Sequence, residues 1–351
     1  MVKRKRNRGK NHYHPAASNV LKVPEALEDP SALERLPVTY QAVNDYYEKL
    51  GAATPFLLRR ETLLRIERVT KRPLVAYVTK TRNLPPAIPA YIDDSDLTGF
   101  SDLIQAIQGD ALDVFIMSNG GSAEATERIV RLLRERFKAI RFIVPANAYS
   151  AATLLCFSGD EIIMDSLGTL GPIDPQINGI PARAILRAFE TIEKRIKEEG
   201  PQVLAAYMPL IMKYDLHILE ICKSAEELSK ELAENWLNTY MLKYPVDDPR
   251  TKEIVKFFAD YDIHKSHGRS IDRKTARGKQ LKIVDVEEIS GLDELVRSLC
   301  NQYELWLDKT SFFKLFENAY GINWGRQAKT VTLQVPVPQP VPQPGPPQRS
   351  Q

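Results

Sequence analysis

The sequence predicts an α/β fold built on a mostly parallel sheet, and two observations carry this prediction. Residues 74–78 and 114–117 are continuous apolar runs, and residues 140–144 are apolar except for Arg141; runs without alternation are typical of strands that a parallel sheet buries on both faces. The second and third runs are each followed by a turn or loop and then by a helical pattern. Strand and helix therefore alternate along the chain, as in folds whose sheets are covered by helices.

Length and composition limit the classes of protein to which the chain can belong. The 351 residues suffice for one large domain or two modest ones, and 43% hydrophobic with 26% charged residues is ordinary for a globular protein. No apolar stretch approaches the ~20 residues of a membrane span, and no apolar segment follows the basic N-terminus as in a signal peptide. The cysteines, Cys156, Cys222 and Cys300, are odd in number, far apart and in apolar surroundings, which favours reduced thiols and a cytoplasmic location.

The N-terminal part is expected to begin with a disordered basic arm over residues 1–20. Six of its first ten residues are Lys or Arg, and a solvated tail is favoured over contact with nucleic acid or anionic lipid. Residues 21–69 are expected to form a helical segment with Tyr40, Val43, Tyr47 and Leu50 on one side.

The first core strand is expected at residues 73–79, followed by a proline-rich loop. A helix then begins with Asp94 or Ser95 as its N-cap. The run at 114–117 is the next strand, Ser118-Asn-Gly-Gly121 a sharp turn, and residues 123–136 an amphipathic helix.

The strand at 140–144 leads through a loop to residues 150–157, a short and nearly all-apolar helix that must be buried. Ser150 stands in its first turn, where unpaired backbone N–H groups and the positive end of the helix dipole converge. A serine there is a candidate nucleophile, which needs a general base because a free hydroxyl is a poor nucleophile near neutral pH.

The C-terminal half is expected to be mainly helical. A helical region for substrate and subunit contacts is predicted first, and a helical segment at 291–330 precedes a disordered tail at 331–351, whose alternating prolines indicate extended polyproline II. The predicted helices of the contact region are 182–199, 201–213 and 224–244.

Three strings carry a family resemblance. They are Ser118-Asn-Gly-Gly-Ser-Ala-Glu-Ala125, Ala148-Tyr-Ser-Ala-Ala-Thr153, and the stretch from Asp160 that ends in Leu170-Gly-Pro-Ile-Asp-Pro-Gln176. Together they resemble the serine dehydrogenase proteinase family, distant relatives of the ClpP and SppA serine peptidases. The similarity is ungapped from Ile92 to Gln176 and weaker to Val286.

The resemblance implies a ClpP/crotonase-like peptidase domain over residues 70–290 that hydrolyses polypeptides without a cofactor or metal and forms homo-oligomers. It implies a triad in the order Ser150, Asp174, His267, with Ile271 following the histidine by four residues. The oxyanion hole would use the backbone N–H of Gly120 or Gly121 together with that of Ala151. Two departures are Asn119, where relatives usually have proline, and Ala151-Ala152, where they have a glycine pair.

Several alternatives stay open on the sequence. His264 is a second candidate base, and Asp174 before a proline also suits a turn. An SppA-like serine–lysine dyad would use Lys194 or Lys197, although both lie in a densely charged helical stretch. Other functions of the same fold are an acyl-thioester enzyme of the crotonase type and a non-catalytic oligomeric scaffold.

Overall fold

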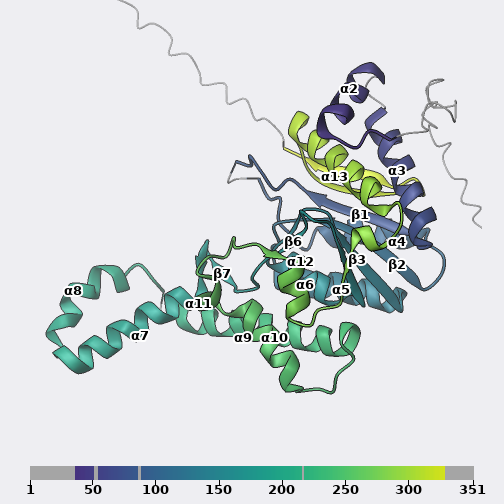
Figure 1. Cartoon of the computed structure of the whole chain (residues 1–351). Helices are drawn as coiled ribbons and strands as arrows, with labels where there is room; N and C mark the ends of the chain where they lie inside the picture. The colour runs from purple at the N-terminus through teal and green to yellow at the C-terminus, as the bar shows by residue number, and fades with distance from the viewer. Residues whose placement is uncertain (1–35, 51–53, 86–87, 216, 329–351) are drawn as a thin grey trace, which may run out of the picture.

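A seven-stranded sheet forms the centre of the computed structural model, which describes residues 36–50, 54–85, 88–215 and 217–328. The predicted basic arm at 1–20 and the proline-rich tail at 331–351 lie outside the described residues. The strand order is β10-β5-β3-β2-β1-β11-β12 (Figure 1). Its members are β1 (Leu74–Thr79), β2 (Ala111–Met117), β3 (Ala139–Val144), β5 (Glu161–Met164), β10 (Ile283–Asp285), β11 (Phe312–Asn318) and β12 (Asn323–Gln327).

Five strands of this sheet, from β10 to β1, are parallel to one another, and β11 and β12 add an antiparallel edge. β1 is buried at every position, and β2 at every position but its first. This burial explains the unbroken apolar runs in the sequence, because helices cover both faces of the sheet. The predicted α/β fold with a mostly parallel sheet is confirmed.

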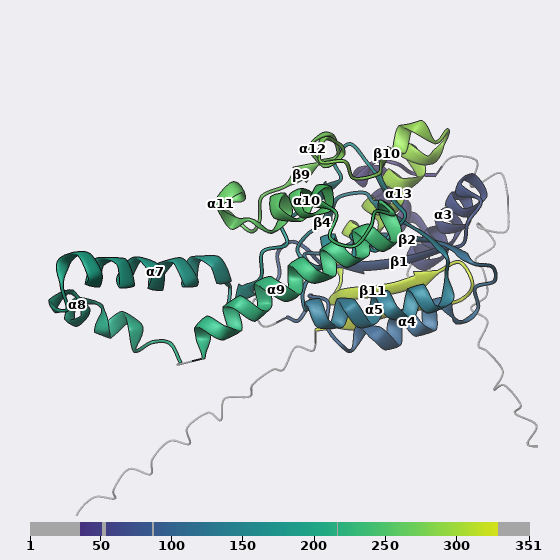
Figure 2. The same ribbon diagram turned by 90° about the horizontal axis from the view of Figure 1, so that it is seen from below.

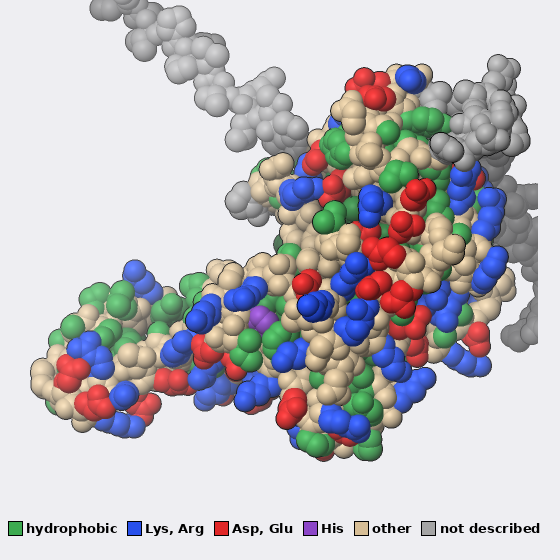
Figure 3. All heavy atoms as spheres, in the orientation of Figure 1, with side chains coloured by type: hydrophobic (Ala, Val, Ile, Leu, Met, Phe, Trp, Pro, Cys, Tyr) green, Lys and Arg blue, Asp and Glu red, His purple; other side chains and the backbone are tan. Residues whose placement is uncertain are grey.

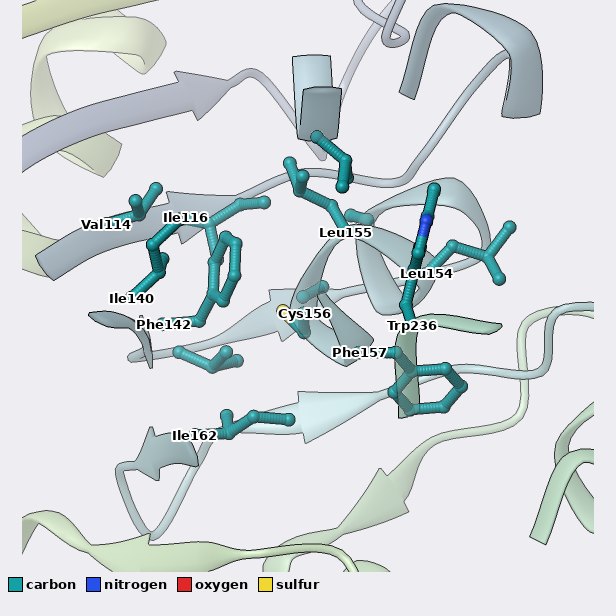
Figure 4. Packing of buried hydrophobic residues seen from close by; sticks show 14 of the residues in the cluster. Val114, Ile116, Ile140, Phe142, Leu154, Leu155, Cys156, Phe157, Ile162 and Trp236 are labelled. Atoms are coloured by element: carbon teal, nitrogen blue, oxygen red, sulfur yellow. The ribbon is translucent and has the colours of Figure 1, made fainter. Parts of the chain in front are cut away.

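Alternate residues of each strand pack into two different apolar layers. Val75 and Tyr77 face one layer, whereas Leu74, Ala76 and Val78 face the other. Figure 4 shows part of the first layer, where strand side chains such as Ile116 and Phe142 meet Leu155 and Phe157. The helices of this layer are α4 (Asp96–Gln105), α5 (Ala123–Arg136), α6 (Ala151–Phe157), α9 (Ile218–Trp236) and α10 (Pro249–Ala259); those of the second are α3 (Thr54–Thr70) and α13 (Leu292–Lys309).

The predicted helical segment at 291–330 is only half correct. α13 ends at Lys309, and the chain then forms β11 and β12, with β11 pairing along β1. The charges in β11 hid its strand character, because Lys314 and Glu317 are buried in ion pairs instead of facing water. The central sheet consequently extends beyond residue 290, the expected end of the domain.

A helical arm projects from the body. It consists of α7 (Ala182–Glu199) and α8 (Gln202–Ile211), and α9 returns the chain to the core (Figures 1 and 2). α9 begins at Ile218 and ends at Trp236, and a π-helical turn follows at Leu237–Met241. The helix expected at 224–244 therefore starts six residues earlier, and its last turn is π-helical instead of α-helical. Among the described helices, none has the length and apolarity needed to cross a bilayer.

The remaining elements are short. α2 (Tyr40–Leu50) packs its Val43 and Tyr47 against Leu58 and Leu305 in a small cluster of its own. Two small sheets lie beside the carboxyl ends of the parallel strands, one of three strands and one hairpin. Their members and the last short helices are β4 (Asn147–Ala148), β6 (Thr169–Leu170), β9 (Ile271–Asp272), β7 (Gln176–Ile177), β8 (Ile180–Pro181), α11 (Tyr261–His264), α12 (Arg273–Gly278) and the 3₁₀ turn Val286–Glu288.

Candidate active site

The three-stranded sheet β4-β6-β9 gathers the segments that carry the predicted triad. Ser150 follows β4, Asp174 follows β6, and His267 precedes β9. Ile271, buried in β9, pairs with Leu170 in β6. This pairing closes a sequence separation of 93 residues between Asp174 and His267.

Ser150 sits in an uncommon backbone conformation at the start of α6. Its φ of 52° and ψ of −122° lie outside the regions that L-residues ordinarily populate. Such a residue costs about 1–3 kcal/mol and persists only where its surroundings hold it. The surroundings hold Ser150 firmly, because every residue of the helix that follows it, α6, is buried. The sharp turn from β4 into α6 presents the serine at the helix N-terminus.

The Gly120–Gly121 peptide has its orientation fixed by Ile92. Ile92 N–H donates to Gly120 O at 2.7 Å, and Ser122 N–H donates to Ile92 O at 2.9 Å. The C=O and N–H of a trans peptide point in opposite directions, so the Gly121 N–H points away from Ile92. A Cβ on Gly121 would collide with the backbone of Ile92, which explains the glycine.

The two glycines differ in what their N–H groups do. The Gly120 N–H donates to Ser118 Oγ at 3.2 Å. Among the described residues, no acceptor takes the N–H of Gly121 or that of Ala151. A Cβ on Gly120 would lie 2.7 Å from Ser150 Cβ and 2.8 Å from the Ala151 nitrogen, so the glycine turn packs directly on the start of α6. Of the two glycine N–H groups, that of Gly121 is therefore the open one.

His267 and Asp174 form a direct contact in the same region. His267 Nδ1 lies 2.8 Å from Asp174 Oδ1, and the aspartate side chain is almost fully buried. A carboxylate accepting from Nδ1–H leaves Nε2 as the acceptor nitrogen of a neutral imidazole. The second oxygen of Asp174 is buried and has no hydrogen-bond partner among the described residues.

The segment before Asp174 is tied to three helices. Thr153 Oγ1, in α6, donates to Ala148 O at 2.7 Å and accepts from Gly171 N–H at 3.0 Å. Ser229 Oγ, in α9, donates to Ile173 O at 2.7 Å, and Ile173 N–H donates to Phe258 O in α10 at 2.8 Å. Ser229 carries no sequence signal of this contact, because a serine within a helix gives no indication of a distant partner.

Ser150, His267 and the glycine turn line one cavity of about 560 Å³. Much of the remaining wall is apolar, and Glu124 is the carboxylate among its lining residues. The sequence predicted substrate contacts from the helical region that includes α9, but neither the particular residues of α9 nor the hairpin β7–β8, since only the folded chain brings them to the serine. The apolar residues of the wall, from α6, from the segment at 173–177 and from α9, are Leu154, Ile173, Pro175, Ile177, Ala225 and Leu228.

The alternative bases lie elsewhere. His264 is buried, and its Nε2 contacts Phe257 O at 2.6 Å. Lys194 and Lys197 are 73% and 71% exposed on α7 and pair with Glu198 and Glu193 of the same helix. None of the three lines the cavity. Within the described residues, no group of three or more His, Cys, Asp or Glu side chains is arranged to hold a metal ion.

The two departures from the resembled pattern both fit the structure. Asn119 donates from Nδ2 to Thr81 O at 3.0 Å and accepts from Asn147 at 2.8 Å, so an amide braces the turn where relatives usually have proline. Ala151 and Ala152 are buried in the first turn of α6, where their methyl groups fill space within the core.

The parallel sheet and the serine at the start of a buried helix define the class as the ClpP/crotonase fold. A family model described as ClpP-like SDH-type serine proteinase matches residues 56–259. The match spans more than half of the chain, so the chain belongs to this family of serine proteinases.

Two relatives come from Methanocaldococcus jannaschii. The uncharacterized protein MJ1495 is 28% identical over 220 residues, which are 59% of this chain and 74% of the relative. The uncharacterized protein MJ0137 is 30% identical over 183 residues, 48% of this chain and 61% of the relative.

Solved structures give weaker likenesses. A serine-to-alanine mutant of the 1510-N membrane-bound stomatin-specific protease is 22% identical with a TM-score of 0.24, covering 33% of this chain and 63% of that chain. A lysine-to-alanine mutant of the same protease, in complex with a substrate peptide, is 16% identical with a TM-score of 0.24. This match covers 56% of this chain and 86% of that chain. The family match, and not these likenesses, therefore places the chain among the serine proteinases.

Proposed function

We propose that this protein hydrolyses peptide bonds through an acyl-enzyme on Ser150. His267 is the general base and Asp174 orients it. The backbone N–H groups of Gly121 and Ala151 receive the oxyanion. The observation that carries the proposal is the 2.8 Å contact between buried Asp174 and His267, a histidine that lines the same cavity as Ser150.

Acylation begins when Ser150 Oγ attacks the carbonyl carbon of the substrate. The hydroxyl proton passes to Nε2 of His267, and Asp174 stabilises the imidazolium that results. The carbonyl oxygen becomes an oxyanion, which accepts from the open N–H groups of Gly121 and Ala151. The C–N bond then breaks, and the leaving amine takes the proton from His267. In deacylation, a water proton passes to His267 while the water oxygen attacks the ester carbon. The C–O bond to Ser150 Oγ then breaks, Oγ takes the proton back from His267, and the acid product is released.

The apolar wall of the cavity favours a polypeptide with an apolar side chain beside the cleaved bond. Ile173, Leu154 and Leu228 offer contacts to such a side chain, whereas an acidic one would lose hydration and meet no Lys or Arg among the described lining residues. The same structure disfavours a serine–lysine dyad through Lys194 or Lys197, because both side chains face solvent.

A fluorophosphonate probe tests the proposal most directly. Ser150 Oγ would displace fluoride from phosphorus, and mass spectrometry would map the adduct to Ser150. Ser150→Ala should abolish the labelling and lower peptide turnover about 10⁶-fold while the fold is kept. The matched control is Ser122→Ala, which removes another hydroxyl at the cavity and should keep the labelling. Labelling that persists in Ser150→Ala and is lost in Ser122→Ala would refute the assignment.

Self-association through the helical arm is part of the proposed function. α8 has no buried residue although its sequence is strongly apolar, and exposed apolar patches of this kind mark interaction sites. Figure 3 shows hydrophobic side chains gathered at the far end of the arm, next to charges of both signs. Mixed charges suit a second copy of the same chain. The exposed apolar residues are Leu204, Met208, Leu210, Met212 and Tyr214.

Light scattering at micromolar concentration measures this association. Leu210→Asp with Met212→Asp should shift the protein toward the monomer, because carboxylates would be buried at the interface. Leu167→Asp is the control, since Leu167 is also strongly exposed but lies on the body. A monomeric wild-type protein would contradict the proposal.

A cytoplasmic location also remains a proposal. It rests on the free cysteines Cys156, Cys222 and Cys300, of which the first two are buried. Burial raises the pKa of the Cys156 thiol, so this cysteine stays a neutral thiol rather than a reactive thiolate.

A further inference from the structure

A buried ionic cluster lies directly beside the segment that orients the Gly121 peptide. Lys314, in β11, is fully buried and donates to Asp96 Oδ1 at 2.8 Å and to Asp93 Oδ2 at 2.9 Å. Tyr77, in β1, donates to Asp96 Oδ2 at 2.7 Å. The cluster therefore binds the C-terminal strand β11 to the turn at residues 93–96.

This turn is continuous with the residue that fixes the glycine peptide. Asp93 follows Ile92, whose N–H and C=O hold Gly120 O and Ser122 N–H. Asp93 N–H donates to Asp96 Oδ2 at 3.1 Å, so the aspartate that Lys314 binds also holds the backbone next to Ile92. Arg326, in β12, adds a contact to Ser95 O at 3.3 Å.

We propose that Lys314 is a positioning residue for the oxyanion hole, acting through Asp93, Asp96 and Ile92 on the Gly121 N–H. This inference rests on the proposed function of Ser150 for its catalytic consequence. The physical reason is that Lys314 donates to both carboxylates of the cluster and offsets part of their charge, and so holds the turn in one geometry. An error of about 1 Å in a catalytic group costs roughly 10²-fold in rate. β11 lies outside the residues 56–259 that the family model matches, so the assignment concerns this chain's own C-terminal hairpin.

The same strand provides a matched control. Glu317 is also fully buried in β11, but it is three residues from Lys314 and faces the opposite layer. It pairs with Arg59 of α3, with Nη2 to Oε1 at 2.7 Å, and accepts from Tyr303 of α13 at 3.0 Å. Breaking either pair leaves a buried charge without its partner, so both changes should lower the melting temperature.

The experiment compares Lys314→Met with Glu317→Gln. Lys314→Met should lower kcat by about 10²-fold with little change in KM, the effect expected for loss of one oxyanion donor. Glu317→Gln should lower stability without this loss in kcat. If Lys314→Met does not fold, Asp93→Asn removes the charge of one of the two carboxylates that Lys314 binds and should show a smaller loss of the same kind.

Hydrogen exchange provides a readout that does not depend on activity. The amides of Ile92 and Ser122 should exchange faster in Lys314→Met, or in Asp93→Asn, and remain protected in Glu317→Gln. Unchanged protection together with wild-type kcat in Lys314→Met would overturn the inference. A wild-type protein that hydrolyses no peptide would contradict the proposed function, while exchange at Ile92 and Ser122 would still decide the role of Lys314.

Discussion

Gly120→Ala tests whether the glycine turn and the nucleophile form one rigid unit. Gly120 has a φ of 95°, which an alanine adopts only at a cost of about 1–2 kcal/mol. Its new Cβ would also meet Tyr149 O and lie 2.7 Å from Ser150 Cβ and 2.8 Å from the Ala151 nitrogen. Forcing such contacts into a packed site costs a further 1–3 kcal/mol, roughly. We expect a total loss of about 2–5 kcal/mol in the free energy of unfolding.

Gly109→Ala is the control for the backbone cost alone. Gly109 has a similar φ of 89°, but an added Cβ would meet nothing within 4 Å. Its expected loss is therefore only about 1–2 kcal/mol. Urea unfolding of both variants measures the difference, and equal slopes of free energy against urea would show that the two variants unfold alike.

The activity of the two variants should differ more than their stability. The contacts with Ser150 and Ala151 can be relieved only if the glycine turn or the start of α6 moves, and either movement displaces a proposed oxyanion donor. We expect a loss of about 10²–10³-fold in kcat for Gly120→Ala and none for Gly109→Ala. A Gly120→Ala protein as stable and as active as Gly109→Ala would refute the reasoning about the turn.

Two further predictions concern the base. Asp174→Asn should lower kcat about 10⁴-fold in a peptide hydrolysis assay, because an amide that donates to Nδ1 favours the wrong tautomer of His267. Turnover near that of the wild type would show that Asp174 only shapes a turn. The double change Lys194→Ala with Lys197→Ala should leave turnover unchanged, because both side chains are exposed. For the same reason it should alter the free energy of unfolding by no more than about 0.5 kcal/mol. A loss of turnover would support the serine–lysine dyad instead.

The fold was predictable from the sequence wherever burial left an apolar pattern. The strands at 74–79, 111–117 and 139–144 were recognised from their mostly apolar stretches at 74–78, 114–117 and 140–144, which are apolar because helices cover both faces of the sheet. The helix at Ala123–Arg136 has the predicted bounds, with Ser122 accepting from Ala125 N–H as its cap. β11 was missed because its buried Lys314 and Glu317 are stabilised by partners far away in sequence, which no local pattern can indicate.

The candidate site was predictable only in part. The glycine turn and Ser150 lie on regular strand–turn–helix units, so local patterns place them. Asp174 and His267 were assigned from the family resemblance, since their contact depends on the pairing of β6 with β9 across a long stretch of chain. The choice of Gly121 over Gly120 needed the hydrogen bond from Gly120 N–H to Ser118, which depends on a side-chain geometry that a sequence does not contain.

The arm lies between Asp174 and His267 in the sequence without separating them in space. α7, α8 and α9 all fall between Asp174 and His267, yet the chain leaves near β7 and returns through α9, whose Leu228 and Ser229 line the same cavity. The hydrogen bond from Ser229 to Ile173 fixes the returning helix to the residue before Asp174. Because both roots of the arm are held there, its length does not loosen the contact between Asp174 and His267. The proposed binding of a second copy at the tip is therefore compatible with a base that forms part of the wall beside Ser150.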